Sequence, residues 1–317
     1  MICLNRNPIL HRTAVMALGG GGARGISHFG GIQAVEEAGI EIVRFVGTSM
    51  GSLVAALAAT AESTEEACEK SLAFLRSDAF TKRQQALFGA HPAPNLKPSH
   101  GMLAWYDRLR SYLWTQQLVH RVFRRQSILP GQVLEEVIAS LVPDIDISQT
   151  KIPLSVVAVD LLSGQQVVLE SGSLRRAIAA SAAIPGIFPP VKWDNMLLCD
   201  VGVVDSLPAR IANAYAAELV VGIDVGPQRS AIAGCESALH VLLRMDEIAE
   251  QMVRDASRQQ VDLLIRPNVG DIEWFDFSDP ERLVEAGRIA GRKALGYDAL
   301  CRKEGRAMLE IGRQVVQ

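Results

Sequence analysis

Apolar and polar residues follow one another in a strand-then-helix order over the first sixty positions of the chain. Apolar runs at 14–18 and 40–45 have the length of buried strands, and the second leads into a run of helix-forming residues at 53–59. Between the two runs, apolar residues recur about every third position until Gly39, which is the spacing of a helix that ends at a glycine. This stretch predicts a strand–helix–strand–helix unit.

The rest of the chain continues the alternation. Strands are predicted at 154–161, 165–169, 191–193, 196–199, 219–224 and 263–265. Helices are predicted at 62–77, 130–142, 173–183 and 236–259, and a C-terminal helix follows Pro280. This order indicates an α/β fold, with a parallel-rich central sheet and helices on both faces. Because no repeat or linker divides the chain, we expect a single domain over residues 1–317, with a helical C-terminal region from about 236.

The stretch from Phe80 to Arg125 differs from its surroundings in composition. It carries eight basic residues against one acid, Asp107, together with seven of the seventeen aromatic residues of the chain. We predict a basic, aromatic, helical cap insertion at about 80–125. Two interpretations stay open: a lid or helix that lies on an anionic membrane surface, and an ordinary helix that packs its aromatic side chains on the core.

Overall composition narrows the class of protein. The formal net charge of −3 gives no indication of a nucleic-acid partner. Five cysteines, scattered and without a C-x-x-C pair, argue against a disulfide framework or a zinc site and fit a reducing compartment. The first thirteen residues are polar, unlike a secretory signal, and no apolar run approaches the ~18 residues of a membrane span. We therefore expect a cytoplasmic protein, or one bound peripherally to the inner face of the membrane.

The candidate nucleophile is Ser49, in the stretch Gly47-Thr48-Ser49-Met50-Gly51. This G-x-S-x-G lies between a predicted strand and a predicted helix, where a sharp turn lifts the serine hydroxyl out of the sheet. The two glycines remove side chains that would clash in such a turn. The alternative is a turn of small residues that only packs the helix against the sheet.

A glycine-rich loop, residues 19–25, joins the first predicted strand to its helix. Consecutive N–H groups without side chains at a helix N-terminus form an anion-binding device. Gly20, Gly22 and Gly25 also match the dinucleotide pattern G-x-G-x-x-G, which requires an acidic residue at the end of the second strand. Glu41 stands at the beginning of that strand instead, so an oxyanion hole for Ser49 is the better interpretation.

The candidate base for Ser49 is Asp200, which ends a predicted strand among apolar neighbours. Partial burial raises the pKa of a carboxylate and makes it a better base. Asp160, Asp205 and Asp224 are competitors. The six histidines are His11, His28, His91, His100, His120 and His240. The order nucleophile–acid–histidine leaves only His240, which falls inside a predicted helix, while His28 is better placed to orient the glycine loop.

Four ordered blocks of the sequence resemble those of the patatin-like phospholipases. They are 20–25 (Gly-Gly-Gly-Ala-Arg-Gly), 47–51 (Gly-Thr-Ser-Met-Gly), 180–185 (Ala-Ser-Ala-Ala-Ile-Pro) and Asp200-x-Gly202. The resemblance implies a three-layer fold and a lipid acyl hydrolase with a Ser49–Asp200 dyad, no catalytic histidine and no metal or organic cofactor. It implies hydrolysis of phospholipids or lysophospholipids through an acyl-enzyme. The implied oxyanion hole consists of Gly20, Gly21, Gly22, Ala23, Arg24 and Gly25, with Arg24 bracing the loop.

Val201 departs from the small residue that the family has after the aspartate. A β-branched residue is disfavoured at positive φ, so we expect an extended Val201 whose side chain points away from Asp200, with only Gly202 free to turn. Two alternatives remain open: a soluble carboxylesterase or thioesterase with the same dyad, and a catalytically silent lipid-binding scaffold.

Overall fold

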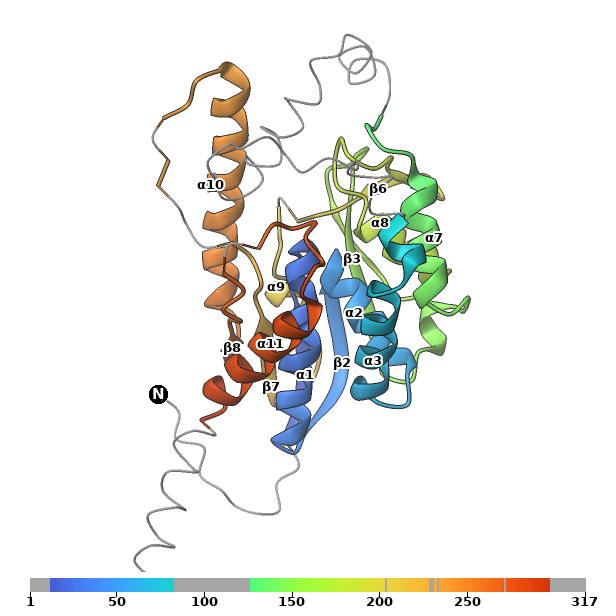
Figure 1. The fold of residues 1–317 in the computed structure, drawn as a ribbon, viewed down its shortest axis with the longest axis vertical. Helices are drawn as coiled ribbons and strands as arrows, with labels where there is room; N and C mark the ends of the chain where they lie inside the picture. The colour runs from blue at the N-terminus through green and yellow to red at the C-terminus, as the bar shows by residue number, and fades with distance from the viewer. Residues whose placement is uncertain are drawn as a thin grey trace, which may run out of the picture.

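The computed structural model describes residues 12–82, 126–202, 204–227, 231–232, 234–270 and 272–296. The strands in this part of the chain form one mixed sheet in the order β5-β6-β3-β2-β1-β7-β8, with β4 paired to β3 (Figure 1). The strands are β1 (Arg12–Leu18), β2 (Ile40–Thr48), β3 (Leu154–Asp160), β4 (Gln166–Leu169), β5 (Val191–Trp193), β6 (Met196–Cys199), β7 (Leu219–Ile223) and β8 (Leu263–Ile265).

The strands of the sheet centre are parallel. β1 pairs in parallel with β2 and β7, β2 pairs in parallel with β3, and β7 with β8. β4, β5 and β6 are antiparallel to their neighbours at one side of the sheet. In the β1–β2 register Leu18 stands opposite Gly47, so the glycine loop after β1 and Ser49 after β2 leave the sheet at the same carboxyl edge.

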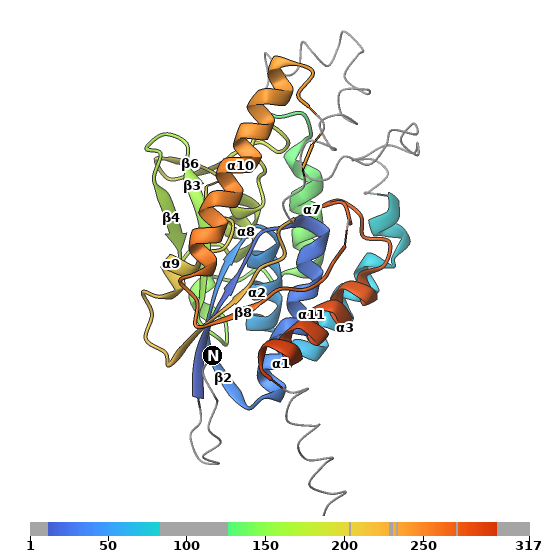
Figure 2. The ribbon, with the colours of Figure 1, turned by 90° about the vertical axis from the view of Figure 1, so that its left-hand side faces the viewer.

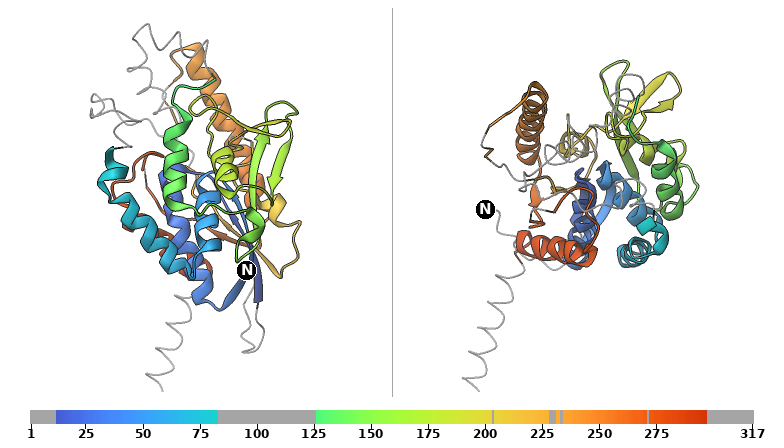
Figure 3. Two further views of the ribbon diagram at one scale, coloured as in Figure 1. Left: turned by 90° about the vertical axis from the view of Figure 1, so that its right-hand side faces the viewer. Right: turned by 45° about the horizontal axis from the view of Figure 1, so that its top comes forward.

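Helices cover both faces of the sheet, as the sequence predicts (Figures 2 and 3). They are the 3-10 helices η1 (Gly22–Ile26) and η2 (Ile147–Gln149), and α1 (Ser27–Glu37), α2 (Met50–Thr60), α3 (Thr64–Leu75), α7 (Gly131–Leu141), α8 (Leu174–Ser181), α9 (Ala209–Ala212), α10 (Ala238–Arg258) and α11 (Pro280–Ala294). The side chains of β1 alternate: Met16 and Leu18 pack on the face that carries α1 and α2, whereas Val15 and Ala17 pack on the face that carries α9.

The predicted α/β fold is therefore confirmed, and the helices and strands predicted outside the insertion at 80–125 are present with small shifts at their ends. Most of the predicted insertion, 83–125, lies outside the described residues. Phe80 at its start is buried and packs edge-on against Phe74 and Phe277, with ring centroids 5.5 and 5.3 Å apart. In the described part of the chain, no helix is both long and apolar enough to cross a membrane.

Candidate active site

Ser49 occupies a strained turn between β2 and α2. Its backbone has φ 54° and ψ −124°, a conformation that residues other than glycine rarely adopt. Both flanking glycines are required by close approach: a Cβ on Gly47 would lie 2.5 Å from the Cα of Ser52, and one on Gly51 would lie 2.2 Å from the carbonyl oxygen of Leu18. The turn lifts Ser49 above the carboxyl edge of the sheet, at the N-terminus of α2.

Ser181, at the end of α8, holds this turn in place. The Ser49 N–H donates to Ser181 Oγ at 2.8 Å, and Ser181 Oγ donates to the carbonyl oxygen of Val157 at 2.7 Å. Ser181 is fully buried, so both bonds are shielded from water. It therefore ties α8 and β3 to the turn that carries Ser49. The sequence places Ser181 in a recognisable block but gives no indication of this role.

Asp200 follows β6 and lies beside Ser49. Both residues line the same cavity, and Asp200 Oδ1 accepts the Gly202 N–H at 2.7 Å. Burial raises the pKa of Asp200 to about 6, against the lowering effects of the nearby Ser49 hydroxyl and the Gly202 N–H. At neutral pH the carboxyl is thus ionised, with a proton affinity well above that of an ordinary aspartate.

Val201 and Gly202 both lie as predicted. Val201 is fully buried in the apolar cluster on the α9 face of the sheet, with Val46 and Val157 among its members, and its φ is not positive. Gly202 lies in the turn that follows, where the Val204 N–H donates to the Val201 carbonyl oxygen at 2.7 Å, so the chain turns at Gly202 as expected, without a positive φ. A Cβ at Gly202 would lie 3.0 Å from Asp200 Oδ1, which is a close contact.

The glycine loop surrounds the other side of Ser49. Gly20 N–H donates to the carbonyl oxygen of Ser206 at 2.8 Å, and Ala23 N–H donates to that of Trp274 at 2.5 Å. Among the described residues, the N–H groups of Gly21 and Gly22 have no acceptor, and both glycines line the cavity at Ser49. Of the predicted oxyanion-hole residues, these two have N–H groups available to a ligand.

The remaining predicted residues of the loop brace it. Arg24 Nε donates to the carbonyl oxygen of Gly21 at 3.1 Å, which fixes the peptide that precedes Gly22. Gly25 allows close packing, since a Cβ there would lie 2.3 Å from the Cγ of Met50. His28 is fully buried, and its Nε2 lies 2.7 Å from the carbonyl oxygen of Gly19, to which it donates. Burial lowers the pKa of His28 to about 4, so the ring is neutral and orients the loop, as the sequence predicts.

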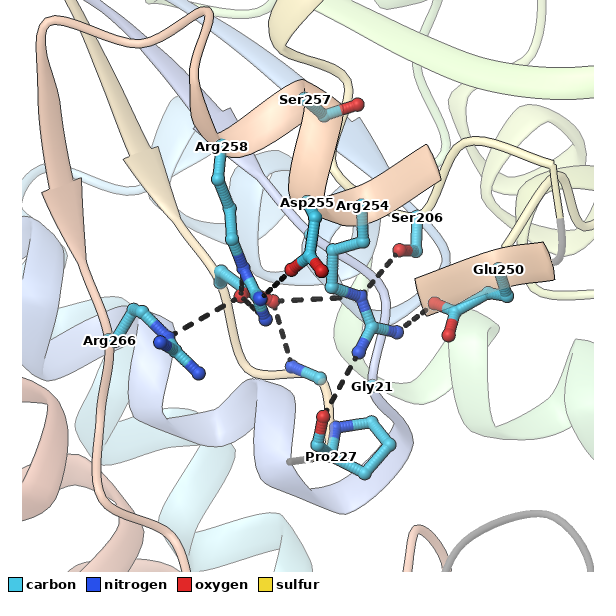
Figure 4. Close-up of polar contacts among 12 residues, drawn as sticks. Gly21, Ser206, Pro227, Glu250, Arg254, Asp255, Ser257, Arg258 and Arg266 are labelled. Atoms are coloured by element: carbon cyan, nitrogen blue, oxygen red, sulfur yellow. Dashed lines mark hydrogen bonds and ion pairs between the residues drawn. The ribbon is translucent and has the colours of Figure 1, made fainter. Parts of the chain in front are cut away.

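The competing carboxylates have other partners. Hydrogen bonds from Ser163 and from backbone N–H groups lower the pKa of Asp160 to about 2. Asp205 accepts from Gln166 Nε2 at 3.0 Å. Asp224 lies between arginines: Arg258 NH2 is 2.5 Å from its Oδ2, and Arg254 Nε is 3.8 Å from its Oδ1 (Figure 4). Asp200 is the carboxylate that the structure brings to Ser49.

The cavity at Ser49 and Asp200 has a volume of about 140 Å³ and a polar wall that the sequence does not predict. Three buried side chains of α10 line it: Glu247, Glu250 and Arg254. Arg254 pairs with Glu250, donates to Ser206 Oγ at 2.9 Å and to the carbonyl oxygen of Pro227 at 3.4 Å (Figure 4). Burial lowers the pKa of Arg254 to about 10, which still leaves it charged.

The part of the chain that the structure describes has no metal-binding cluster, but it does contain a second cavity. No group of three or more His, Cys, Asp or Glu side chains in the described residues is arranged to hold a metal ion. A larger cavity of about 530 Å³ lies between α7 and α8, lined by Glu135, Arg175 and Arg176 among others.

Comparison with known proteins decides the family. A model described as patatin-like phospholipase matches residues 16–213, which include the glycine loop, Ser49 and Asp200. The chain belongs to the patatin-like phospholipase family. The assignment covers well over half of the chain, and it agrees with the resemblance that the four sequence blocks predict.

The relatives of this patatin-like chain are longer proteins. An uncharacterised NTE family protein of Mycobacterium tuberculosis is 27% identical over 313 residues, covering 90% of this chain and 47% of the relative. Another, of Mycobacterium bovis, is 32% identical over 225 residues, covering 68% of this chain and 51% of the relative. Patatin-like phospholipase domain-containing protein 6 of Mus musculus is 32% identical over 218 residues, 68% of this chain and 14% of its own length. The chain thus spans about half the length of the bacterial relatives, or less.

Two solved structures are similar at low identity. VipD from Legionella pneumophila has a TM-score of 0.45 and 16% identity, covering 90% of this chain and 67% of VipD. The type III effector ExoU has a TM-score of 0.35 and 14% identity, covering 90% of this chain and 53% of ExoU. Scores this low add nothing to the family assignment.

The buried charge of Asp200 predicts that Asp200→Asn stabilises the fold at neutral pH. A carboxyl whose pKa is raised from 3.8 to about 6 on folding lowers the free energy of unfolding as pH rises through that window, by roughly 3 kcal/mol at most. We expect the variant to exceed the wild type in urea denaturation at pH 7.5 and to match it near pH 4. Ser49→Ala, which keeps the buried charge, should show no such gain. An equal difference at both pH values would contradict the argument.

The Ser181 hydrogen bonds predict that Ser181→Ala is destabilising. The substitution leaves the buried Ser49 N–H unpaired, which costs about 1–3 kcal/mol and loosens the turn that carries the nucleophile. Ser71→Ala is a matched control, because Ser71 is equally buried but donates only to the Ala67 carbonyl within its own helix. We expect Ser181→Ala to lower both the melting temperature and ester turnover more than the control does. Equal effects of the two variants would rule out a special role for Ser181.

Proposed function

We propose that this chain is a serine lipid acyl hydrolase that cleaves carboxylic ester bonds of phospholipids or lysophospholipids. The observation that carries the proposal is that Ser49 and the buried Asp200, whose pKa is about 6, line one cavity together with Gly21 and Gly22. The family assignment supports the class of reaction and a lipid as the substrate. No cofactor is needed for this chemistry, since the dyad and backbone N–H groups supply the base, the nucleophile and the anion site.

In the proposed mechanism, Ser49 Oγ attacks the ester carbonyl carbon while Asp200 accepts the hydroxyl proton. The carbonyl oxygen becomes an oxyanion and is bound by the N–H groups of Gly21 and Gly22. When the tetrahedral intermediate collapses, Asp200 returns the proton to the departing alcohol and the acyl group stays on Ser49. Asp200 then takes a proton from water as that water attacks the acyl carbon. When this second tetrahedral intermediate collapses, the bond between the acyl carbon and Ser49 Oγ breaks, Asp200 returns the proton to Oγ, and the fatty acid is released.

The electrostatics of the site suit this sequence of steps. A base is most effective when its pKa lies near the working pH, and burial brings Asp200 there without a histidine. Ser49 stands at the N-terminus of α2, so the positive end of the helix dipole favours negative charge close to the nucleophile. His28 stays neutral and contributes no competing charge.

A second candidate is a soluble carboxylesterase or thioesterase with the same dyad. The observation that favours it is the volume of the cavity, about 140 Å³. This is smaller than the roughly 300–1,000 Å³ typical of sites for larger ligands, and it suits a short acyl chain. The substrate panel described below separates the two candidates.

The dyad predicts that Ser49→Ala and Asp200→Asn each lower turnover on the order of 10³-fold or more while the protein stays folded. Turnover would be measured on phospholipids, lysophospholipids and short-chain esters, so that the preferred class is identified in the same experiment. A fluorophosphonate probe should label Ser49 alone, as read by peptide mass spectrometry. His240→Ala is the control and should keep its activity. A folded His240→Ala as inactive as Asp200→Asn, or labelling at another serine, would overturn the dyad.

The pKa of Asp200 predicts the pH dependence of hydrolysis. Protonated Asp200 cannot accept the Ser49 proton, so kcat/KM should be level above pH 7 and fall tenfold per pH unit below about pH 6. His28, with a pKa of about 4, does not titrate in this range. The measurement is a pH–rate profile on a short-chain ester, over a pH range in which the loss of activity is reversible. Undiminished kcat/KM at pH 4.5 would exclude Asp200 as the base.

A further inference from the structure

The helix α10 carries its apolar residues on the outside. Six large apolar side chains are exposed on it, with exposed fractions from 37% for Ile248 to 68% for Leu242. The six are Val241, Leu242, Met245, Ile248, Met252 and Val253. Their spacing of three or four residues places them on one face of the helix, which we call the outer face of α10. Ala249 and Ala256 on the same face are exposed as well, and no charged residue interrupts it.

The opposite face of α10 is polar and buried. Glu247, Glu250, Gln251, Arg254 and Ser257 have exposed fractions between 4% and 7%. A surface helix of a water-soluble domain normally has the reverse arrangement, with its apolar stripe toward the core. The burial of this polar face is explained by the cavity at Ser49, which Glu247, Glu250 and Arg254 line. Nothing in the described part of the chain accounts for the outer face.

The N-terminal part of the outer face lies at the carboxyl edge of the sheet, where the candidate active site is. The N-terminal half of α10 extends beyond the carboxyl edge of the sheet (Figures 1 and 2). At that same edge β3 ends, and the next two residues, Leu161 and Leu162, are exposed to 52% and 69%. Because β2 and β3 are parallel, Ser49 also emerges there. Exposed apolar residues thus occur on two separate elements around one edge.

We propose that the outer face of α10, together with Leu161 and Leu162, docks on the surface of a lipid bilayer. This inference rests on the proposed function, in which the substrate is a bilayer lipid that has to reach Ser49. A fluid bilayer accommodates apolar side chains from two separate elements without a shaped counterpart, and an interfacial helix buries one such face among the acyl chains. The same helix then contacts the membrane on one side and lines the cavity on the other.

The charges beside the outer face determine how the docking depends on lipid and salt. Arg244 and Asp255 flank one side and Asp246 the other, and α10 contains no lysine. Arg254 and Arg258 are engaged with Asp224 on the buried side. The flanks therefore carry no net positive charge, and attraction to anionic headgroups contributes little. Docking through this surface is apolar, so it occurs on zwitterionic vesicles and persists at high salt.

The experiment measures vesicle binding in the Ser49→Ala background, which leaves the lipids intact. Sucrose-loaded vesicles of phosphatidylcholine, alone or mixed with phosphatidylglycerol, are sedimented at low and high salt. The test variant is Leu242→Glu with Met245→Glu, and the control is Ile289→Glu, since Ile289 is 59% exposed on α11. We expect the double variant to reduce partitioning to phosphatidylcholine by about tenfold or more, the control to match the parent, and salt to have little effect.

Three results would overturn the inference. The first is a folded double variant, with an unchanged melting temperature, that binds vesicles as the parent does. The second is binding only to anionic vesicles at low salt. The third is a parent that is a dimer in sedimentation velocity and becomes a monomer in the double variant, because a second copy then covers the outer face. Hydrolysis of a dispersed short-chain ester by the wild type tests the proposed function separately. Ester hydrolysis with no vesicle binding refutes only the docking surface.

Discussion

The backbone of Ser49 is the constraint on which the rest of the site depends. A residue other than glycine at φ 54° is held there only because its surroundings leave no alternative. Gly51 lies against the end of β1, and the Ser49 N–H is bound by Ser181, which is itself bound to β3. Three strands and two helices therefore meet at one turn. The conformation of Ser49 is a property of the packed sheet, and the sequence around it only permits that conformation.

Burial acts on Asp200 and His28 in opposite directions. It raises the proton affinity of Asp200 and lowers that of His28, so the carboxyl becomes the group that titrates near neutral pH and the imidazole stays neutral. In the proposed mechanism, Asp200 thus takes the role that histidine usually has in serine hydrolases. The same burial that raises the proton affinity of Asp200 also destabilises the folded chain at neutral pH, where the proposed base would work. Site chemistry and fold stability oppose each other at this residue.

Local patterns in the sequence predict the strands, the helices and the turn at Ser49, because each depends on residues within about ten positions. Val201 follows the same logic, since alternation along a strand sets its direction. Contacts between distant segments escape such reasoning. Ser181 is 132 residues from Ser49, and nothing in its neighbours identifies the backbone N–H that it binds. The Ala23 N–H donates to the backbone carbonyl oxygen of Trp274, and that bond does not depend on which side chain residue 274 carries.

The helix α10 shows why amphipathic periodicity alone cannot orient a helix. Its pattern has a clear apolar stripe, and the ordinary rule directs that stripe toward the core. Here the carboxylates and the guanidinium on the other stripe satisfy one another and Asp224 around a polar cavity, which makes burial of that side tolerable. Because the polar stripe faces the cavity, the apolar stripe on the opposite side of the helix has to face outward. The polar wall of the cavity and the apolar outer surface are thus two consequences of one choice of helix orientation.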